Sequence, residues 1–152
     1  MKQSFIKISK ITEPPNSNIW VYPSGTKAQI KSRIKELQGL GVQDISFQGE
    51  LKIGTISVLG KGYVGIVVLG KLGRKKVAVK IRRNDSPRKN LKKEAQLLQI
   101  TNRYGVGPKL IDYSKNFLVI EYLEGEKIGR YIDILGGRGN ICLLYTSPSP
   151  RD

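Results

Sequence analysis

Three glycines and one lysine carry the strongest chemical signal in the sequence. Gly60, Gly62 and Gly65 follow the spacing G-x-G-x-x-G, and Lys80 closes the segment VAVK at 77–80. Because glycine has no Cβ, backbone amides in such a turn can approach phosphate oxygens closely. A lysine on a strand adds a fixed positive charge beside them. The spacing therefore indicates a phosphate-binding site. The alternative is a β-meander with glycine turns and a surface lysine.

A glutamate is the candidate partner of this lysine. Residues 88–103 are predicted to form a helix with one apolar stripe, which begins after Ser86-Pro87. The stripe contains Leu91, Ala95 and Leu98. Glu94 falls on the same stripe, and a carboxylate on a buried face is costly without a counter-charge. We therefore expect Glu94 to pair with Lys80, the alternative being an exposed glutamate that balances neighbouring lysines.

The elements around these residues alternate between strands and glycine turns. The segment at 66–69 is apolar and β-branched, which predicts a strand and not the helix of a dinucleotide-binding fold. In the next strand, at 77–81, alternation places Ala78 and Lys80 on one face and the β-branched residues on the other. A Walker-type loop is excluded, because no Gly-Lys pair is followed by Ser or Thr.

This order resembles the small lobe of the protein kinase superfamily, whose signature joins G-x-G-x-x-G-x-V to a strand bearing a lysine. Val67 supplies the valine, and the resemblance covers residues 53–135. It implies an α+β fold with an antiparallel five-stranded sheet and one helix of the kinase αC type, preceded by a small N-terminal extension with a helix. It also implies ATP as the nucleotide, with Lys80 and Glu94 as catalytic residues: Lys80 holds the phosphates and Glu94 orients Lys80.

Further site residues follow from the same resemblance. The apolar run at 117–120 and the EYLEG that follows it resemble the hinge between kinase lobes. Ile120 is the implied gatekeeper, with the Glu121 carbonyl and the Leu123 amide meeting the adenine edge. Three apolar residues, Leu59, Val67 and Ala78, are implied to cover the adenine face. The complete implied nucleotide-binding set is Leu59, Gly60, Gly62, Gly65, Val67, Ala78, Lys80, Ile120, Glu121 and Leu123.

The catalytic half of a kinase is absent from the 152 residues. No catalytic-loop aspartate with its asparagine and no D-F-G metal ligand occurs. The resemblance places these groups, with the Mg²⁺ ligands, in a large lobe that begins at 126–141, and no metal ligand is predicted in this chain. We expect the chain to bind ATP without transferring phosphate, and the longer parent to phosphorylate Ser/Thr hydroxyls of proteins. Residues 142–152, CLLYTSPSPRD, are similar to a translated sequencing adapter, so the natural sequence is expected to diverge there.

Residues 1–48 are predicted to form the extension that precedes the lobe and hinge at 49–125. Pro14 and Pro15 separate two short extended stretches at 5–8 and 19–22. Residues 26–40 are predicted to form an amphipathic helix that ends at glycines and packs on the domain. Its apolar positions are Ile30, Ile34 and Leu37, and its other faces carry Lys27, Lys31, Arg33 and Lys35. Strands are predicted at 42–47 and at 51–59, the latter leading into the glycine loop.

Composition leaves a second class of function open. Twenty-seven Lys and Arg against twelve Asp and Glu give a net charge of +15, which favours ribosome or nucleic-acid association. The absence of histidine excludes histidine acid–base chemistry and histidine metal ligands. No signal peptide or membrane-length apolar run is found, so we expect a cytoplasmic protein without a membrane partner. The alternatives to a protein kinase are a pseudokinase or basic ribosome- or RNA-binding scaffold, and a small-molecule kinase of the aminoglycoside or choline type.

Overall fold

The computed structural model describes residues 4–122, which adopt an α+β fold on one antiparallel sheet. Along the sheet the strand order is β1-β2-β6-β7-β9-β8, with β5 also paired to β6. The strands are β1 (Ile6–Lys7), β2 (Val42–Ser46), β5 (Gly60–Lys61), β6 (Gly65–Leu72), β7 (Lys75–Arg82), β8 (Leu110–Tyr113) and β9 (Phe117–Glu121). The predicted α+β class and antiparallel sheet are confirmed. The sheet is wider than the predicted five strands, because β1 and β2 from the N-terminal part extend it past β6.

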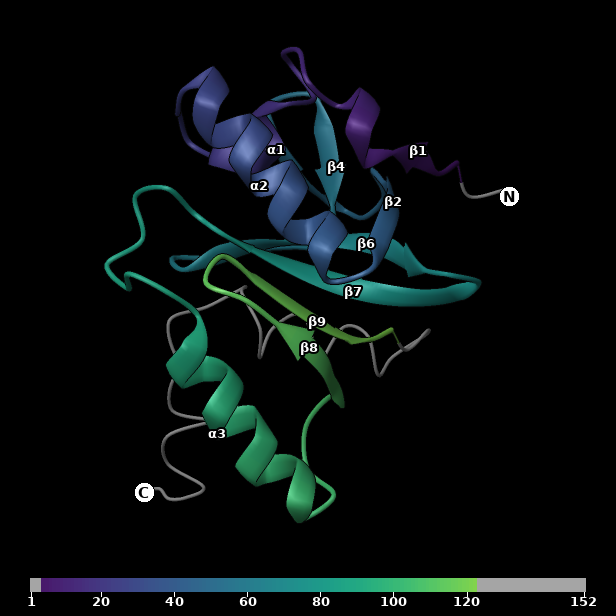
Figure 1. Ribbon diagram of the computed structural model, residues 1–152, viewed down its shortest axis with the longest axis vertical. Helices are drawn as coiled ribbons and strands as arrows, with labels where there is room; N and C mark the ends of the chain where they lie inside the picture. Colours follow the sequence, from purple (N-terminus) through teal and green to yellow (C-terminus); the bar gives the residue numbers. More distant parts are fainter. Residues whose placement is uncertain (1–3, 123–152) are drawn as a thin grey trace.

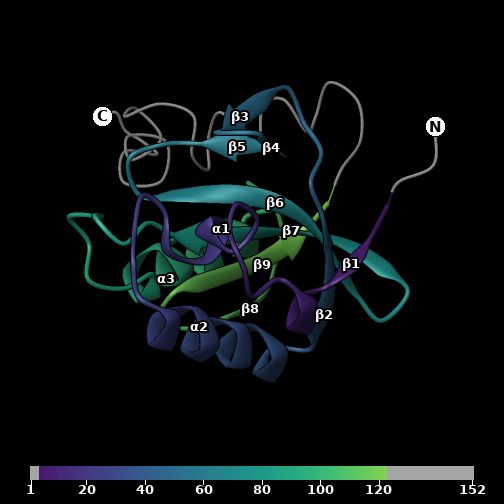
Figure 2. The same cartoon turned by 90° about the horizontal axis from the view of Figure 1, so that it is seen from above.

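Helices cover both faces of this sheet (Figure 1). They are η1, a 3-10 turn (Ile8–Lys10), α1 (Asn18–Val21), α2 (Lys27–Gly39) and α3 (Lys92–Arg103). α1 and α2 lie on one side of β6 and β7, and α3 lies on the other. In the view of Figure 2, α1 lies between α2 and a separate two-stranded hairpin, β3 (Leu51–Ile53) and β4 (Ile56–Val58).

The main hydrophobic core fills the space between the sheet and the N-terminal helices. Its members from the sheet include Val68, Val77, Val79, Phe117 and Val119, and those from the helices include Ile19, Trp20, Ile30, Ile34 and Leu37. Trp20 is fully buried, with its ring edge-on to Phe117 at 6.3 Å between centroids. Its Nε1 donates a hydrogen bond to the Ile11 carbonyl at 2.8 Å. The N-terminal segment and the sheet therefore share one core.

Two of the predicted strands take a different form. Residues 19–22 were expected to be extended, but Ile19, Trp20 and Val21 lie in helix α1 and are all buried. A short apolar run has no periodicity that separates strand from helix, so tertiary packing decides. The single strand expected over 51–59 is divided into β3 and β4, because Gly54 turns the chain with φ of 61°.

Helix α2 begins and ends where its sequence signals predict, whereas α3 ends at Arg103 as predicted but begins late. Thr26 and Gln29 form a reciprocal capping box at the start of α2, with Gln29 N to Thr26 Oγ1 at 3.1 Å. α3 begins at Lys92, four residues later than predicted from Ser86-Pro87. The Asn90 side chain accepts a hydrogen bond from the Lys92 amide at 3.0 Å, and this contact marks the start.

Candidate functional site

Strand β7 places Lys80 on the face of the sheet opposite the main core. Lys80 pairs with Val67 of β6 on one side and with Leu118 of β9 on the other, and Ala78 pairs with Ile120. Directly opposed residues in an antiparallel ladder point to the same face. The alternation predicted from the sequence is therefore confirmed, and Lys80 and Ala78 lie on the face that α3 covers.

Lys80 and Glu94 form a buried ion pair on that face. Lys80 Nζ lies 2.5 Å from Glu94 Oε1, and the two side chains are only 1% and 5% exposed. α3 presents Glu94 from the buried face that also carries Ala95 and Leu98. The predicted contact between the lysine and the glutamate is present.

The hydrogen-bonding capacity of this pair is only partly used. An ammonium group has three N–H donors, and within residues 4–122 the Lys80 ammonium has Glu94 as its hydrogen-bond partner. The second carboxylate oxygen, Glu94 Oε2, is buried without a hydrogen bond, and Arg88 Nη1 lies 3.9 Å from it. Buried charges are costly unless their remaining groups are satisfied. The pair thus presents a fixed buried cation that can donate further hydrogen bonds to an anion.

The glycine segment forms a tight hairpin beside Lys80. The Gly62 amide donates to the Gly65 carbonyl at 3.0 Å, and Gly60 pairs with β6. None of these three glycines has a positive φ. Gly65 has a steric reason instead, because a Cβ there would lie 2.6 Å from the Ile81 carbonyl oxygen. Close approach of two strands explains Gly65.

Arg83 fastens this hairpin to the end of β7, a role that the sequence did not reveal. Its amide donates to the Val64 carbonyl at 2.7 Å, and its Nη1 donates to the Gly62 carbonyl at 3.1 Å. The Nε and Nη2 atoms of Arg83 donate to the two carboxylate oxygens of Asp85, each at 2.8 Å. These hydrogen bonds raise the pKa of Arg83 and lower the pKa of Asp85, so both groups are charged at neutral pH.

Replacing Arg83 with alanine is expected to loosen the hairpin without unfolding the protein. The guanidinium contact to Gly62 is lost, while an exposed ion pair contributes only about 0–1 kcal/mol to stability. Hydrogen exchange of the 61–64 amides should quicken at an almost unchanged unfolding midpoint. Lys76→Ala, in the hairpin at the far end of β7, is the control. Unchanged exchange at 61–64 in Arg83→Ala would contradict the fastening role.

The apolar residues implied to face adenine come together in the structure. Val67, Ala78 and Ile120 are buried in one cluster with Leu98 of α3, and Leu59 packs against that cluster. This cluster adjoins Lys80 through the strand register.

The hinge residues are only partly described. Glu121 ends β9, and its backbone amide donates to the Lys109 carbonyl at 3.0 Å. Its carboxylate accepts from the Lys109 amide at 3.1 Å, so the side chain has a structural contact. Leu123 lies outside the described residues.

Arg33 was predicted to lie on an outer, basic face of the helix, and this prediction is wrong. It is 4% exposed, and its Nη1 donates to the carbonyls of Trp20 and Arg82, each at 2.6 Å. Burial lowers the pKa of Arg33 to about 10, with Arg82 adding to the shift and Glu36 opposing it. Arg33 follows Ile30 by three residues, so the spacing that identified Glu94 could have identified it.

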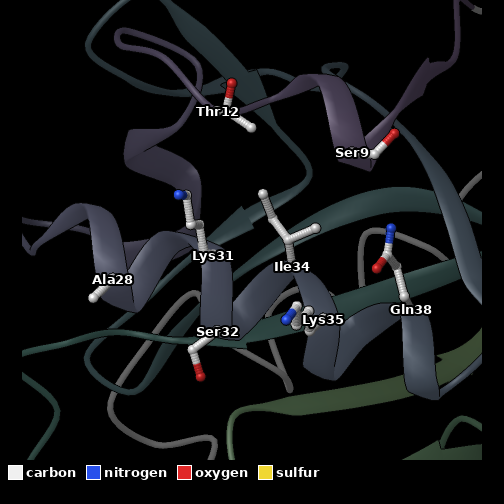
Figure 3. A pocket seen from close by; sticks show the side chains of 8 residues that line it. All are labelled: Ser9, Thr12, Ala28, Lys31, Ser32, Ile34, Lys35 and Gln38. Atoms are coloured by element: carbon white, nitrogen blue, oxygen red, sulfur yellow. The ribbon is translucent and has the colours of Figure 1, made fainter.

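A separate hollow of about 620 Å³ lies along α2, away from the ion pair (Figure 3). It is bounded by α2 and by Ser9 and Thr12, and Lys31 and Lys35 line it. These elements pack on the opposite side of the sheet from Lys80. The hollow is therefore no part of the site around the ion pair.

No helix within residues 4–122 has the length and apolar character needed to cross a bilayer. In the same range, His, Cys, Asp and Glu side chains form no group of three or more that could hold a metal ion. Compared with known proteins, the chain matches no family model, and no curated protein matches it significantly.

Proposed function

We propose that this chain is the ATP-binding part of a protein-kinase-like phosphotransferase that acts on Ser/Thr hydroxyls of proteins. The observation that carries the proposal is the buried Lys80–Glu94 pair beside the glycine hairpin. A lysine held on a central strand, with N–H donors left over, is suited to bind phosphate oxygens. Replacing a buried ion pair by apolar residues is often neutral or stabilising, so stability alone does not require the pair.

The surroundings of the pair support the same proposal. The apolar cluster of Val67, Ala78 and Ile120 lies next to the cation and has the apolar character that suits a purine ring. The hairpin at 60–65 pairs with β6, the strand that lies directly beside Lys80. An antiparallel sheet with a helix that supplies the counter-charge is compatible with a small-lobe fold. An apolar cluster, a glycine hairpin and a fixed cation together match the base and phosphates of a nucleotide.

Each residue has a defined part in this proposal. Lys80 donates to the phosphate oxygens, and Glu94 holds the ammonium in position by accepting one of its hydrogen bonds. Gly60 and Gly62 let the backbone approach the phosphates, while backbone groups of Glu121 and Leu123 meet the adenine edge. Mg²⁺ neutralises phosphate charge in phosphoryl transfer, but within residues 4–122 no group of three or more His, Cys, Asp and Glu side chains could hold it.

Labelling with an acyl phosphate of ATP tests the proposal directly. The amine of a lysine beside the bound phosphates attacks the acyl carbon, an amide forms and ATP leaves. We expect mass spectrometry to find the label on Lys80 and excess ATP to suppress it. The exposed Lys27, Lys31 and Lys35 serve as internal controls. Labelling that is spread over these exposed lysines and insensitive to ATP would contradict the proposal.

A basic scaffold is the second candidate, and one observation favours it. Lys27, Lys31 and Lys35 are exposed and recur every four residues along α2, and Lys31 and Lys35 also line the hollow in Figure 3. Such a stripe suits the phosphate backbone of RNA. Binding through it would weaken steeply with salt and would be unaffected by Lys80→Met, whereas nucleotide binding at the ion pair would be lost.

A further inference from the structure

Glu36 of α2 accepts hydrogen bonds from the turn between β8 and β9, which is distant from α2 in the sequence. Its carboxylate accepts hydrogen bonds from the Asn116 amide at 2.8 Å and from Asn116 Nδ2 at 2.7 Å. The hydroxyl of Ser114 donates to the same carboxylate. Three donors from one turn therefore converge on one side chain of the N-terminal segment. Carboxylates with several directed donors hold a fixed geometry.

The same turn, at 114–116, is also hydrogen-bonded to the start of α3. The Leu91 amide donates to the Lys115 carbonyl at 2.9 Å, and the Ala95 amide donates to the Leu91 carbonyl at 2.9 Å. Leu91 is fully buried and precedes Glu94 by three residues. The position of the turn thus sets where the first turn of α3 begins, and with it the position of the Glu94 carboxylate.

Strand β7 is tied to the same turn beside the ion pair. Arg82 Nε donates to Asn116 Oδ1 at 2.8 Å, and the Arg82 amide donates to the Asn116 carbonyl at 2.8 Å. Arg82 lies two residues after Lys80, on the same face of the strand. Its Nη1 also donates to the Arg88 carbonyl at 3.2 Å, in the connector that leads to α3. The turn at 114–116 is thus bonded to the elements that carry both members of the ion pair.

We infer that Glu36 is a positioning residue for the Lys80–Glu94 pair: through the 114–116 turn it fixes α3 relative to β7. The inference rests on the proposed function, because the value of a fixed pair is that it presents Lys80 to a nucleotide. Through Glu36, the N-terminal segment would control the position of the Lys80–Glu94 pair. A ligand or partner that moved α2 would change nucleotide affinity from the opposite side of the sheet.

Glu36→Ala tests the inference, with Leu37→Ala as its matched control. Leu37 is fully buried in the same helix, but its side chain cannot hydrogen-bond to the turn. The first readout is hydrogen exchange of the Leu91 and Ala95 amides relative to Val79 in central strand β7. Global destabilisation speeds exchange at Val79 at least as much as at Leu91 and Ala95, so it cannot raise this ratio. We expect Glu36→Ala to raise the ratio roughly 10-fold and Leu37→Ala not to raise it.

The second readout is ATP affinity, measured well below each unfolding midpoint. We expect Glu36→Ala to weaken ATP binding roughly 5- to 10-fold, a size typical of coupled sites, and Leu37→Ala to leave it near wild type. An unchanged exchange ratio, or unchanged affinity despite a raised ratio, would overturn the inference while leaving the proposed function intact. If the wild-type chain binds no ATP, the proposed function fails, and the exchange ratio still decides whether Glu36 positions α3.

Discussion

Replacing Lys80 with methionine is expected to weaken ATP binding roughly 10- to 100-fold, the size of a lost hydrogen bond to a charged group. The same change should destabilise the fold by about 3–5 kcal/mol, because it leaves the Glu94 carboxylate buried without its partner. Arg88, 3.9 Å from Glu94 Oε2, offers partial compensation. Calorimetric titration and chemical denaturation measure the two effects separately.

The double variant Lys80→Met/Glu94→Met separates binding from stability. It removes both buried charges and replaces them with unbranched apolar side chains, so its stability should return to within about 1 kcal/mol of wild type or exceed it. ATP binding should stay as weak as in the single variant. A double variant that regained ATP affinity along with stability would show that Lys80 serves the fold and not the nucleotide.

Replacing Trp20 with alanine is expected to destabilise the whole described unit by about 3–5 kcal/mol. The side chain is fully buried, packs against Phe117 of β9, and donates to the Ile11 carbonyl. Because the N-terminal segment and the sheet share this core, unfolding should remain one cooperative transition at a lower midpoint. Thermal and denaturant unfolding provide the measurement. Circular dichroism is the probe, because it does not depend on the fluorescence of Trp20.

The control for Trp20→Ala is Tyr104→Ala. Tyr104 is another aromatic residue but is 80% exposed, so its truncation should change stability by no more than about 0.5 kcal/mol. A second transition in Trp20→Ala, with the sheet unfolding at the wild-type midpoint, would mean that residues 4–48 fold independently of the sheet.

The sequence predicted the ion-pair face well, because that face depends on simple periodicity. Alternation in 77–81 placed Lys80 opposite the β-branched residues, and helical spacing placed Glu94 on a buried stripe. Each residue alone would be a costly buried charge, so each needs an opposite charge as a partner, and one contact between Lys80 and Glu94 supplies both. The glycine pattern located a hairpin beside Lys80, although strand packing accounts for Gly65.

The sequence could not show what joins distant segments. Glu36 and Asn116 are 80 residues apart, and nothing local signals their hydrogen bonds. Arg33 had helical spacing in its favour but was assigned to the basic face, because a buried arginine requires carbonyl partners that only the fold supplies. Helix α1 likewise depends on the core, since a four-residue apolar segment has no period of its own.

Titration of ATP into the wild-type chain and into Lys80→Met/Glu94→Met, with adenosine titrated in parallel, tests most directly whether Lys80 is a phosphate-binding residue. The double variant keeps the apolar cluster of Val67, Ala78 and Ile120, so adenosine should bind both proteins equally. ATP should bind the wild-type chain and bind the double variant at least roughly 10-fold more weakly at equal stability. Equal ATP affinity in both proteins, or no ATP binding by the folded wild-type chain, would contradict the assignment of Lys80 to nucleotide phosphates.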